Sequence, residues 1–265
     1  MPESHKVDRS IYLEERRDQI LDLLDRDNAV NISDLSNRFQ VSSATIRKDI
    51  RALERDGKLR RTHGGAIKQS AFPEPGFETA EVSAHEEKVR IGRAAAEFVS
   101  DGDTILVQSG TTCRELVRAL EGRRGLTLIL SDIAIALEAE RILPDSDIIL
   151  LGGKLRTGYH YAQGIETARQ LRRYHVPLAF LGCNALSFEY GATAHRIEQA
   201  TWMREQLEAS DRHIMLLDSS KIGAIAPVFA ADLAELDVLI TDSRVNRGER
   251  ERFAQEARGL EVIYA

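Results

Sequence analysis

The sequence predicts an α/β protein of two domains: a small N-terminal domain of helices and a basic strand pair, then a larger domain with a mostly parallel sheet. Three observations indicate this. Residues 33–67 have the pattern of two short helices followed by two basic strands. Residues 69–85, QSAFPEPGFETAEVSAH, contain two prolines and a glycine and show no apolar period. Beyond them, helix-like segments alternate with short apolar runs, as in α/β domains.

The first predicted helix covers residues 13–26, and residues 1–12 are expected to be a frayed end. Ile20, Leu23 and Leu24 recur at helical spacing and fall on one face. This helix therefore has an apolar side that can pack against the rest of the N-terminal domain.

Two short helices with a tight turn between them are expected next. Ser33 can cap the first of these helices, and Leu35 and Phe39 lie four residues apart on one side of it. Residues 40–42 are too few to form anything but a turn. Ser42 at the end of this turn can cap the second helix.

The second of these helices has one apolar and one cationic face. Ile46, Ile50 and Leu53 follow i, i+4, i+7 spacing and form a single buried stripe. Gly57 is expected to end the helix. The opposite face is expected to read double-stranded DNA through base edges and phosphates, with Ser43, Thr45, Arg47, Lys48 and Arg51.

Residues 58–65 predict a strand, a glycine turn and a return strand, which completes a winged helix-turn-helix pattern. Arg60, Arg61 and His63 on this wing are expected to contact the DNA backbone. Eight Lys or Arg against three Asp or Glu give residues 42–68 a net charge of +5, whereas residues 71–265 carry −8. The alternative is an ordinary three-helix domain with a solvated charged face.

The chain thus divides into a winged helix-turn-helix DNA-binding domain at 1–68, a linker at 69–85 and an α/β domain at 86–265. In the last, apolar strands are expected at 104–108, 126–131, 147–151, 178–182, 213–217 and 237–241. Helices are expected near 86–100, 112–121, 132–142, 163–174, 196–210 and 247–258. This alternation predicts a mostly parallel sheet covered by helices, with a ligand at the carboxyl ends of its strands.

Small and polar residues follow these strand ends. Gln108, Ser109, Gly110, Thr111 and Thr112 join the first strand to a helix, where hydroxyls and helix N–H groups suit an anion. If the loops converge, the site suits a small phosphorylated polyol, and ordinary turn chemistry is the alternative for each loop. The other candidate ligand-binding residues are Asp132, Gly152, Gly153, Arg156, Asn184 and Lys221.

The composition is that of a globular domain without metal or disulfide motifs. Cys113 and Cys183 form no disulfide framework and fit a reducing cytoplasm. The sequence has no C-x-x-C, no H-E-x-x-H and no His pair at metal spacing, so no metal or cofactor is expected. No apolar stretch matches a signal peptide or a membrane span, which favours a cytoplasmic protein with no membrane partner.

The runs VSSATIRKDIRAL and GKLRRTHGGA resemble the DeoR-type helix-turn-helix of bacterial sugar-metabolism repressors. EKVRIGRAAAEFVSDGDTILVQSGTT, IILLGGKLR, FLGCN, LLDSSKIG and FAADLAELDVLITD follow in the order of that family's C-terminal sensor domain, so the resemblance covers roughly residues 13–243. It implies an effector-sensing domain similar to ribose-5-phosphate isomerase and CoA-transferase folds. Carried over by position, the phosphate contacts fall on Ser109, Gly110, Thr111 and Thr112, and a polar contact falls on Lys221.

The resemblance also implies a repressor of a sugar or polyol catabolic operon that a phosphorylated sugar or related metabolite relieves. The chain departs from the family's common residues at four pertinent positions: Gln108 replaces Asp, Asp132 replaces Asn, Ser187 replaces Asp and Gln199 replaces Glu. A carboxylate is thus lost at one strand end and gained at another.

Two other functions fit the same fold. A sugar-phosphate isomerase-like enzyme carrying a DNA-binding domain would need a placed acid and base. Residues 184–187 hold no carboxylate, Asp132 remains a possible base, and Asp218 is expected to orient Lys221. A purely oligomerising domain would explain the fold but not its polar strand ends. We therefore expect a DNA-binding regulator and no enzyme.

A homodimer or homotetramer is also expected. One recognition helix reads only a few base pairs, so specific binding to an operator needs at least two. The acidic C-terminal part is the expected assembly surface, because the basic part repels its own copies.

Overall fold

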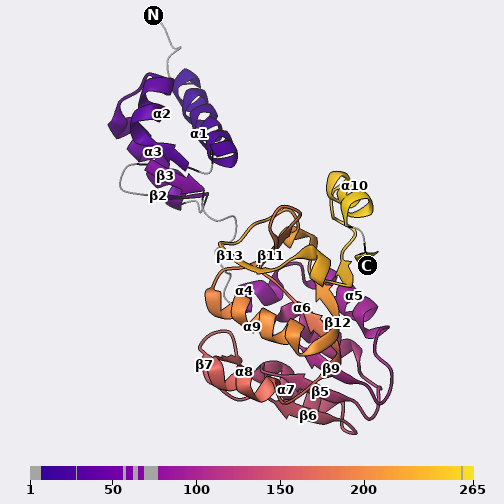
Figure 1. Ribbon diagram of the computed structural model, residues 1–265. Helices are drawn as coiled ribbons and strands as arrows, with labels where there is room; N and C mark the ends of the chain where they lie inside the picture. Colours follow the sequence, from indigo (N-terminus) through magenta and orange to yellow (C-terminus); the bar gives the residue numbers. More distant parts are fainter. Residues whose placement is uncertain (1–6, 28, 56–57, 62–64, 69–76, 258) are drawn as a thin grey trace, which may run out of the picture. The chain divides into compact units, whose positions relative to one another are not determined.

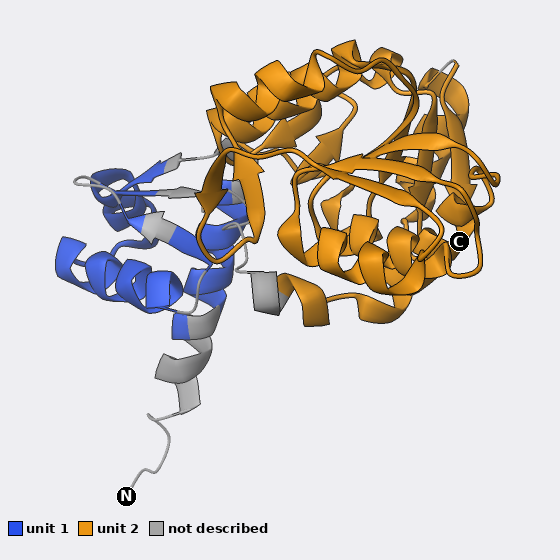
Figure 2. Cartoon of the chain, turned by 90° about the horizontal axis from the view of Figure 1, so that it is seen from below, with its two compact units in different colours: residues 1–73 blue, residues 74–265 orange. Residues whose placement is uncertain are grey.

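The computed structural model divides the chain into two compact units, residues 1–73 and residues 74–265 (Figure 2). The structure describes residues 7–27, 29–55, 58–61, 65–68, 77–257 and 259–265. Each unit has a hydrophobic core of its own, and the two are described separately below.

The N-terminal unit contains three helices and a small antiparallel sheet (Figure 1). The helices are α1 (Val7–Asp27), α2 (Ile32–Phe39) and α3 (Ser43–Arg55), and the strands β1 (Ala29–Asn31), β2 (Leu59–Arg61) and β3 (Gly65–Lys68) pair in the order β1-β3-β2. α1 begins before the predicted residue 13, and β1 was not predicted. The core contains the predicted apolar residues Ile20, Leu24, Leu35, Ile46, Ile50 and Leu53.

The caps of α2 and α3 set the turn between these helices. Asn31, and not Ser33, caps α2: because the helix already begins at Ile32, the Asn31 side chain accepts from the Ser33 N–H at 2.9 Å. Ser42 caps α3 as predicted, since its hydroxyl accepts from the Thr45 N–H at 3.2 Å. Gln40 ends α2 in the left-handed conformation, with φ 51°. Gly57 lies outside the described residues.

A buried carboxylate joins α3 to α1. Asp49 is only 1% exposed, and its two oxygens accept from Arg16 Nε at 2.7 Å and from Arg17 Nε at 3.4 Å. Asp49 lies on the inner side of the helix whose outer side carries the predicted DNA-reading cations. The two ion pairs therefore fix which face of α3 points outward.

The second unit contains a seven-stranded sheet in which every strand pairs parallel to its neighbours. In spatial order its strands are β15 (Glu261–Tyr264), β14 (Val238–Thr241), β12 (Ser210–Leu216), β9 (Val176–Leu181), β4 (Thr104–Val107), β5 (Thr127–Leu130) and β6 (Asp147–Leu150). The six predicted strands are confirmed, and β15 was missed. The N-terminal helix-turn-helix and the parallel α/β part together confirm the predicted fold class.

Helices cover both faces of this sheet, as Figure 1 shows. One core lies under α5 (His85–Ala96), α6 (Thr111–Ala119) and α7 (Ile133–Ile142), and the other under α8 (Ile165–Leu171), α9 (Ile197–Glu208) and α10 (Arg247–Glu256). All six helices match predicted ones. Alternate residues of one strand serve opposite cores: Ile105 and Val107 belong to the first and Leu106 to the second.

Two antiparallel additions were not predicted. β7 (Lys154–Arg156) and β8 (Tyr161–Gln163) form a hairpin. β10 (Ala185–Ser187), β11 (Gly191–Ala194) and β13 (Val228–Ala231) form a separate sheet. These strands are only three or four residues long, too short for alternation to reveal them in the sequence.

The proposed linker 69–85 is helical in its described part. α4 (Phe77–Val82) occupies it, and residues 69–76 lie outside the described residues. α4 is held by side chains from the helices that follow: the Lys88 ammonium donates to the Ser83 carbonyl at 2.6 Å, and Arg114 Nη1 contacts Glu81 Oε1 at 2.7 Å. This short helix thus belongs to the second unit.

The Asp49 pairs yield the first prediction. Asp49→Ala should destabilise the N-terminal unit by about 1–3 kcal/mol, because two partly buried guanidinium groups lose their acceptor. Hydrogen exchange of peptides from α3 measures this local stability. Asp34→Ala, at an exposed position of α2, is the matched control and should leave that exchange nearly unchanged. Equal exchange in both variants would mean that the pairs do not hold α3.

Candidate functional site

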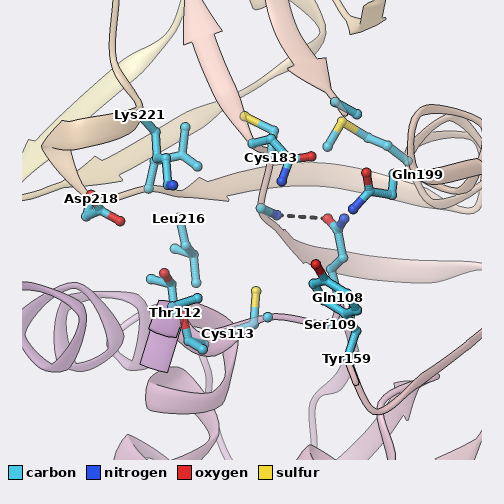
Figure 3. A pocket seen from close by; sticks show the side chains of 18 of the residues that line it. Gln108, Ser109, Thr112, Cys113, Tyr159, Cys183, Gln199, Leu216, Asp218 and Lys221 are labelled. Atoms are coloured by element: carbon cyan, nitrogen blue, oxygen red, sulfur yellow. Dashed lines mark hydrogen bonds between the residues drawn. The ribbon is translucent and has the colours of Figure 1, made fainter. Parts of the chain in front are cut away.

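A cavity of about 180 Å³ lies at the carboxyl ends of β4, β9 and β12 (Figure 3). Seven of the predicted ligand-binding residues line it: Gln108, Ser109, Gly110, Thr111, Thr112, Asn184 and Lys221. Residues from three separate loops thus meet at one mouth, as expected from the parallel sheet.

The N-terminus of α6 forms one wall of the cavity. Gly110 precedes this helix with φ 131°, a backbone conformation that other residues rarely adopt, and has no side chain to cap the first turn. The first-turn residues Thr111, Thr112 and Cys113 all line the cavity. Their N–H groups and the positive end of the helix dipole favour an anion at this point.

Two lysines supply positive charge. Lys88 is 5% exposed, burial lowers the pKa of its ammonium, and the group donates to the carbonyls of Ala80 and Ser83. Lys221 stands at the end of a short 3₁₀ turn, Ser219–Lys221, that Asp218 caps by accepting from the Ser220 N–H at 3.1 Å. Asp218 therefore fixes the turn that carries Lys221, which agrees with the orienting role expected for it.

Asp132 does not line the cavity, contrary to the expectation that it would contact ligand hydroxyls. Its side chain has no exposed surface, and one carboxylate oxygen caps α7 by accepting from the N–H groups of Ala134 at 2.9 Å and Ile135 at 3.1 Å. Burial raises the pKa of this carboxyl group. The carboxylate gained at this strand end therefore caps the helix that follows, and it also interacts with the backbone N–H of Gly110 in the cavity wall.

Gly152, Gly153 and Arg156 also lie outside the cavity lining. The Gly152 carbonyl accepts from the Thr167 hydroxyl at 2.9 Å, and a Cβ on Gly153 would lie 2.1 Å from the same hydroxyl oxygen. Gly153 therefore allows close packing of α8 against the loop. The Arg156 guanidinium stacks 3.6 Å from the ring centre of Tyr159 and donates to the Tyr161 hydroxyl at 2.7 Å. It therefore supports two aromatic residues of the cavity wall.

Other lining residues were missed from the sequence, among them Lys88, Tyr159, Tyr161, Cys183 and Trp202. Lys88 could have been identified from the sequence, because it shares a helical face with the buried Ile91 and Ala95. A lysine on an apolar stripe needs a partner or a function. Both cysteines are poor nucleophiles here, since burial raises the pKa of the Cys113 and Cys183 thiols to about 12.

The predicted DNA-reading face is the outer side of α3. Ser43, Arg47, Lys48 and Arg51 are exposed and Thr45 is half-buried. On the wing, Arg61 is exposed and contacts Glu54, Nε to Oε2, at 3.7 Å. The side chain of Arg60 and the whole of His63 lie outside the described residues.

Each of the two units matches a known protein family. Residues 16–71 match the DeoR-like helix-turn-helix domain, and residues 83–243 match the DeoR C-terminal sensor domain. The chain belongs to the DeoR family. It is therefore a transcriptional regulator and not an enzyme, with a DNA-binding domain and a sensor domain for an effector.

Relatives resemble it over nearly their whole length. The transcriptional regulator GolR of Listeria innocua is 32% identical over 95% of this chain and 98% of its own. A putative aga operon transcriptional repressor of Escherichia coli is 31% identical over 94% and 93%, respectively. The lactose phosphotransferase system repressor of Lactococcus lactis is 31% identical over 91% and 95%.

Among solved structures, ribose 5-phosphate isomerase from Plasmodium falciparum matches with 14% identity and a TM-score of 0.37, covering 52% of each chain.

No helix among the described residues is long and apolar enough to cross a membrane. The same residues contain no cluster of three His, Cys, Asp or Glu side chains that could hold a metal ion.

The DNA face can be tested by titrating operator binding against salt. Arg61→Ala should weaken binding to all sequences and reduce the slope of log K against log salt by about one. Arg47→Ala should instead cost about 1–3 kcal/mol on the specific operator and less on unrelated DNA. Arg93→Ala on α5 removes an exposed cation from the second unit and is the control. An unchanged slope in Arg61→Ala would mean that the wing does not contact the DNA.

Proposed function

We propose that this regulator represses a sugar or polyol catabolic operon and that a phosphorylated sugar or related metabolite in the cavity relieves the repression. The observation that supports this most directly is the uncapped N-terminus of α6, which faces the cavity together with Ser109, Thr111 and Thr112. Hydroxyls, first-turn N–H groups and nearby lysines are the donors that a phosphate dianion requires.

The position of Lys88 supports a route from the cavity to the DNA-binding domain. Lys88 lines the cavity, and its ammonium donates to the carbonyls of Ala80 and Ser83 at the end of α4. In the sequence, α4 closely follows the segment that joins the two domains. A bound anion would compete with these carbonyls for the ammonium, and so loosen or shift α4. A coupling of about 1–3 kcal/mol suffices for useful regulation.

Assembly into a homodimer or homotetramer is part of the proposal. Exposed apolar side chains on the second unit support it, including Leu137, Ile165 and Ile197, each more than 60% exposed. Sedimentation should detect a dimer or larger species at micromolar concentration, with two half-sites occupied on the operator. A monomer that binds a single half-site tightly would contradict this part of the proposal.

The effector site is tested by Thr111→Val, which removes a hydroxyl and keeps the side-chain shape. Operator affinity without effector should stay nearly unchanged, and the response to a phosphorylated sugar should be lost. Thr104→Val, at the opposite end of β4, is the control and should respond like the wild type. A normal response in Thr111→Val would mean that the phosphate site lies elsewhere.

A further inference from the structure

The amide of Gln108 has a fixed orientation. Its Oε1 accepts from the backbone N–H of Gly182 at 2.8 Å, and a backbone N–H can only donate. The amide nitrogen must therefore point the other way, toward the amide of Gln199, as Figure 3 shows. Gln108 therefore presents its N–H donors on the side away from Gly182, whose N–H occupies one acceptor site of Oε1.

Asn184 is oriented by the same logic. Its Oδ1 accepts from the backbone N–H of His195 at 3.1 Å, so its amide nitrogen points away from that N–H. Asn184 also lines the cavity. Two amide side chains from different strand ends thus present N–H groups whose direction the backbone determines.

The rest of the lining is also rich in donors. Asp218 is the single carboxylate among the described lining residues, and it already accepts from the Ser220 hydroxyl and N–H. Lys88 and Lys221 outnumber it. The Trp202 indole N–H is buried with no acceptor. Among the described lining residues no carboxylate lies at the Gln108 end, so a second anionic group of a ligand would meet N–H donors there without charge repulsion.

We propose that the effector is a phosphorylated sugar acid, with its phosphate at the N-terminus of α6 and its carboxylate at the amides of Gln108 and Asn184. This inference rests on the proposed function, which supplies the phosphate, and adds the chemical identity of the group at the other end of the ligand. Figure 3 shows Thr112 of α6 and the amides of Gln108 and Gln199 at different places around the cavity, so one small molecule can contact both.

Calorimetric titration of the full-length protein tests this with sets of compounds that share the phosphate end and differ in the oxidation state of the carbon remote from it. One set is 3-phosphoglycerate, glyceraldehyde 3-phosphate and glycerol 3-phosphate; the other is 6-phosphogluconate, glucose 6-phosphate and sorbitol 6-phosphate. In at least one set the acid should bind about tenfold or more tightly than the alcohol, as expected for charge-assisted hydrogen bonds. An alcohol or aldehyde that binds as tightly as its acid in both sets would overturn the inference.

Gln108→Glu and Asn184→Asp are the matched variants. Each keeps the oxygen that accepts from the backbone N–H and replaces only the ligand-facing amide nitrogen with an anionic oxygen. Both should weaken the acid about tenfold or more and change the binding of inorganic phosphate much less. Retained phosphate binding also shows that the variant is folded. Unchanged acid affinity in both variants would overturn the inference.

The outcomes separate this inference from the proposed function. If the phosphorylated alcohols or aldehydes bind and release the operator while the acids do not, the inference fails and the proposed function stands. If neither inorganic phosphate nor any phosphorylated compound binds in the cavity, both fail.

Discussion

The second unit depends on one local constraint, the glycine turn between β4 and α6. Gly110 takes up φ 131° and leaves the first turn of α6 without a capping side chain at the mouth of a cavity. A helix end of this kind needs hydrogen-bond acceptors from elsewhere. The surrounding loops supply hydroxyls and lysines, and an anionic ligand would provide the acceptors that these first-turn N–H groups lack within the helix.

At the neighbouring strand ends, a carboxylate side chain caps the turn that follows. Asp132 caps α7 after β5, and Asp218 caps the short turn after β12. Both acids are thereby used within the protein, and the cavity keeps little negative charge of its own. Under the proposed function, the contrast between capped and uncapped turns at one sheet edge places the anion at α6.

α4 is held by residues of the two helices that border the cavity. Lys88 and Arg114, from the two helices that follow in the chain, hold α4 through its carbonyls and through Glu81. Arg114 belongs to the helix whose N-terminus faces the cavity, and Lys88 lines the cavity directly. Under the proposed function, an anion bound at this point would act on contacts that hold the segment next to the interdomain connection.

Much of this arrangement could be predicted from the sequence, because helical and strand periods and capping residues are local signals. The stripe of Ile46, Ile50 and Leu53 located the recognition helix correctly, and the apolar runs located six of the seven parallel strands. The failures have long-range causes. Whether Asp132 caps a helix or faces a ligand depends on its burial, and the role of Arg156 depends on a hairpin too short to be recognised.

The most direct test of this account is amide hydrogen exchange of the turn at residues 109–113, measured with and without a saturating phosphorylated effector. The account predicts slower exchange at Thr111, Thr112 and Cys113, whose N–H groups would bind the phosphate, together with a change in exchange in α4. Release from the operator with unchanged exchange in this turn would contradict it, because the effector would then act from another site.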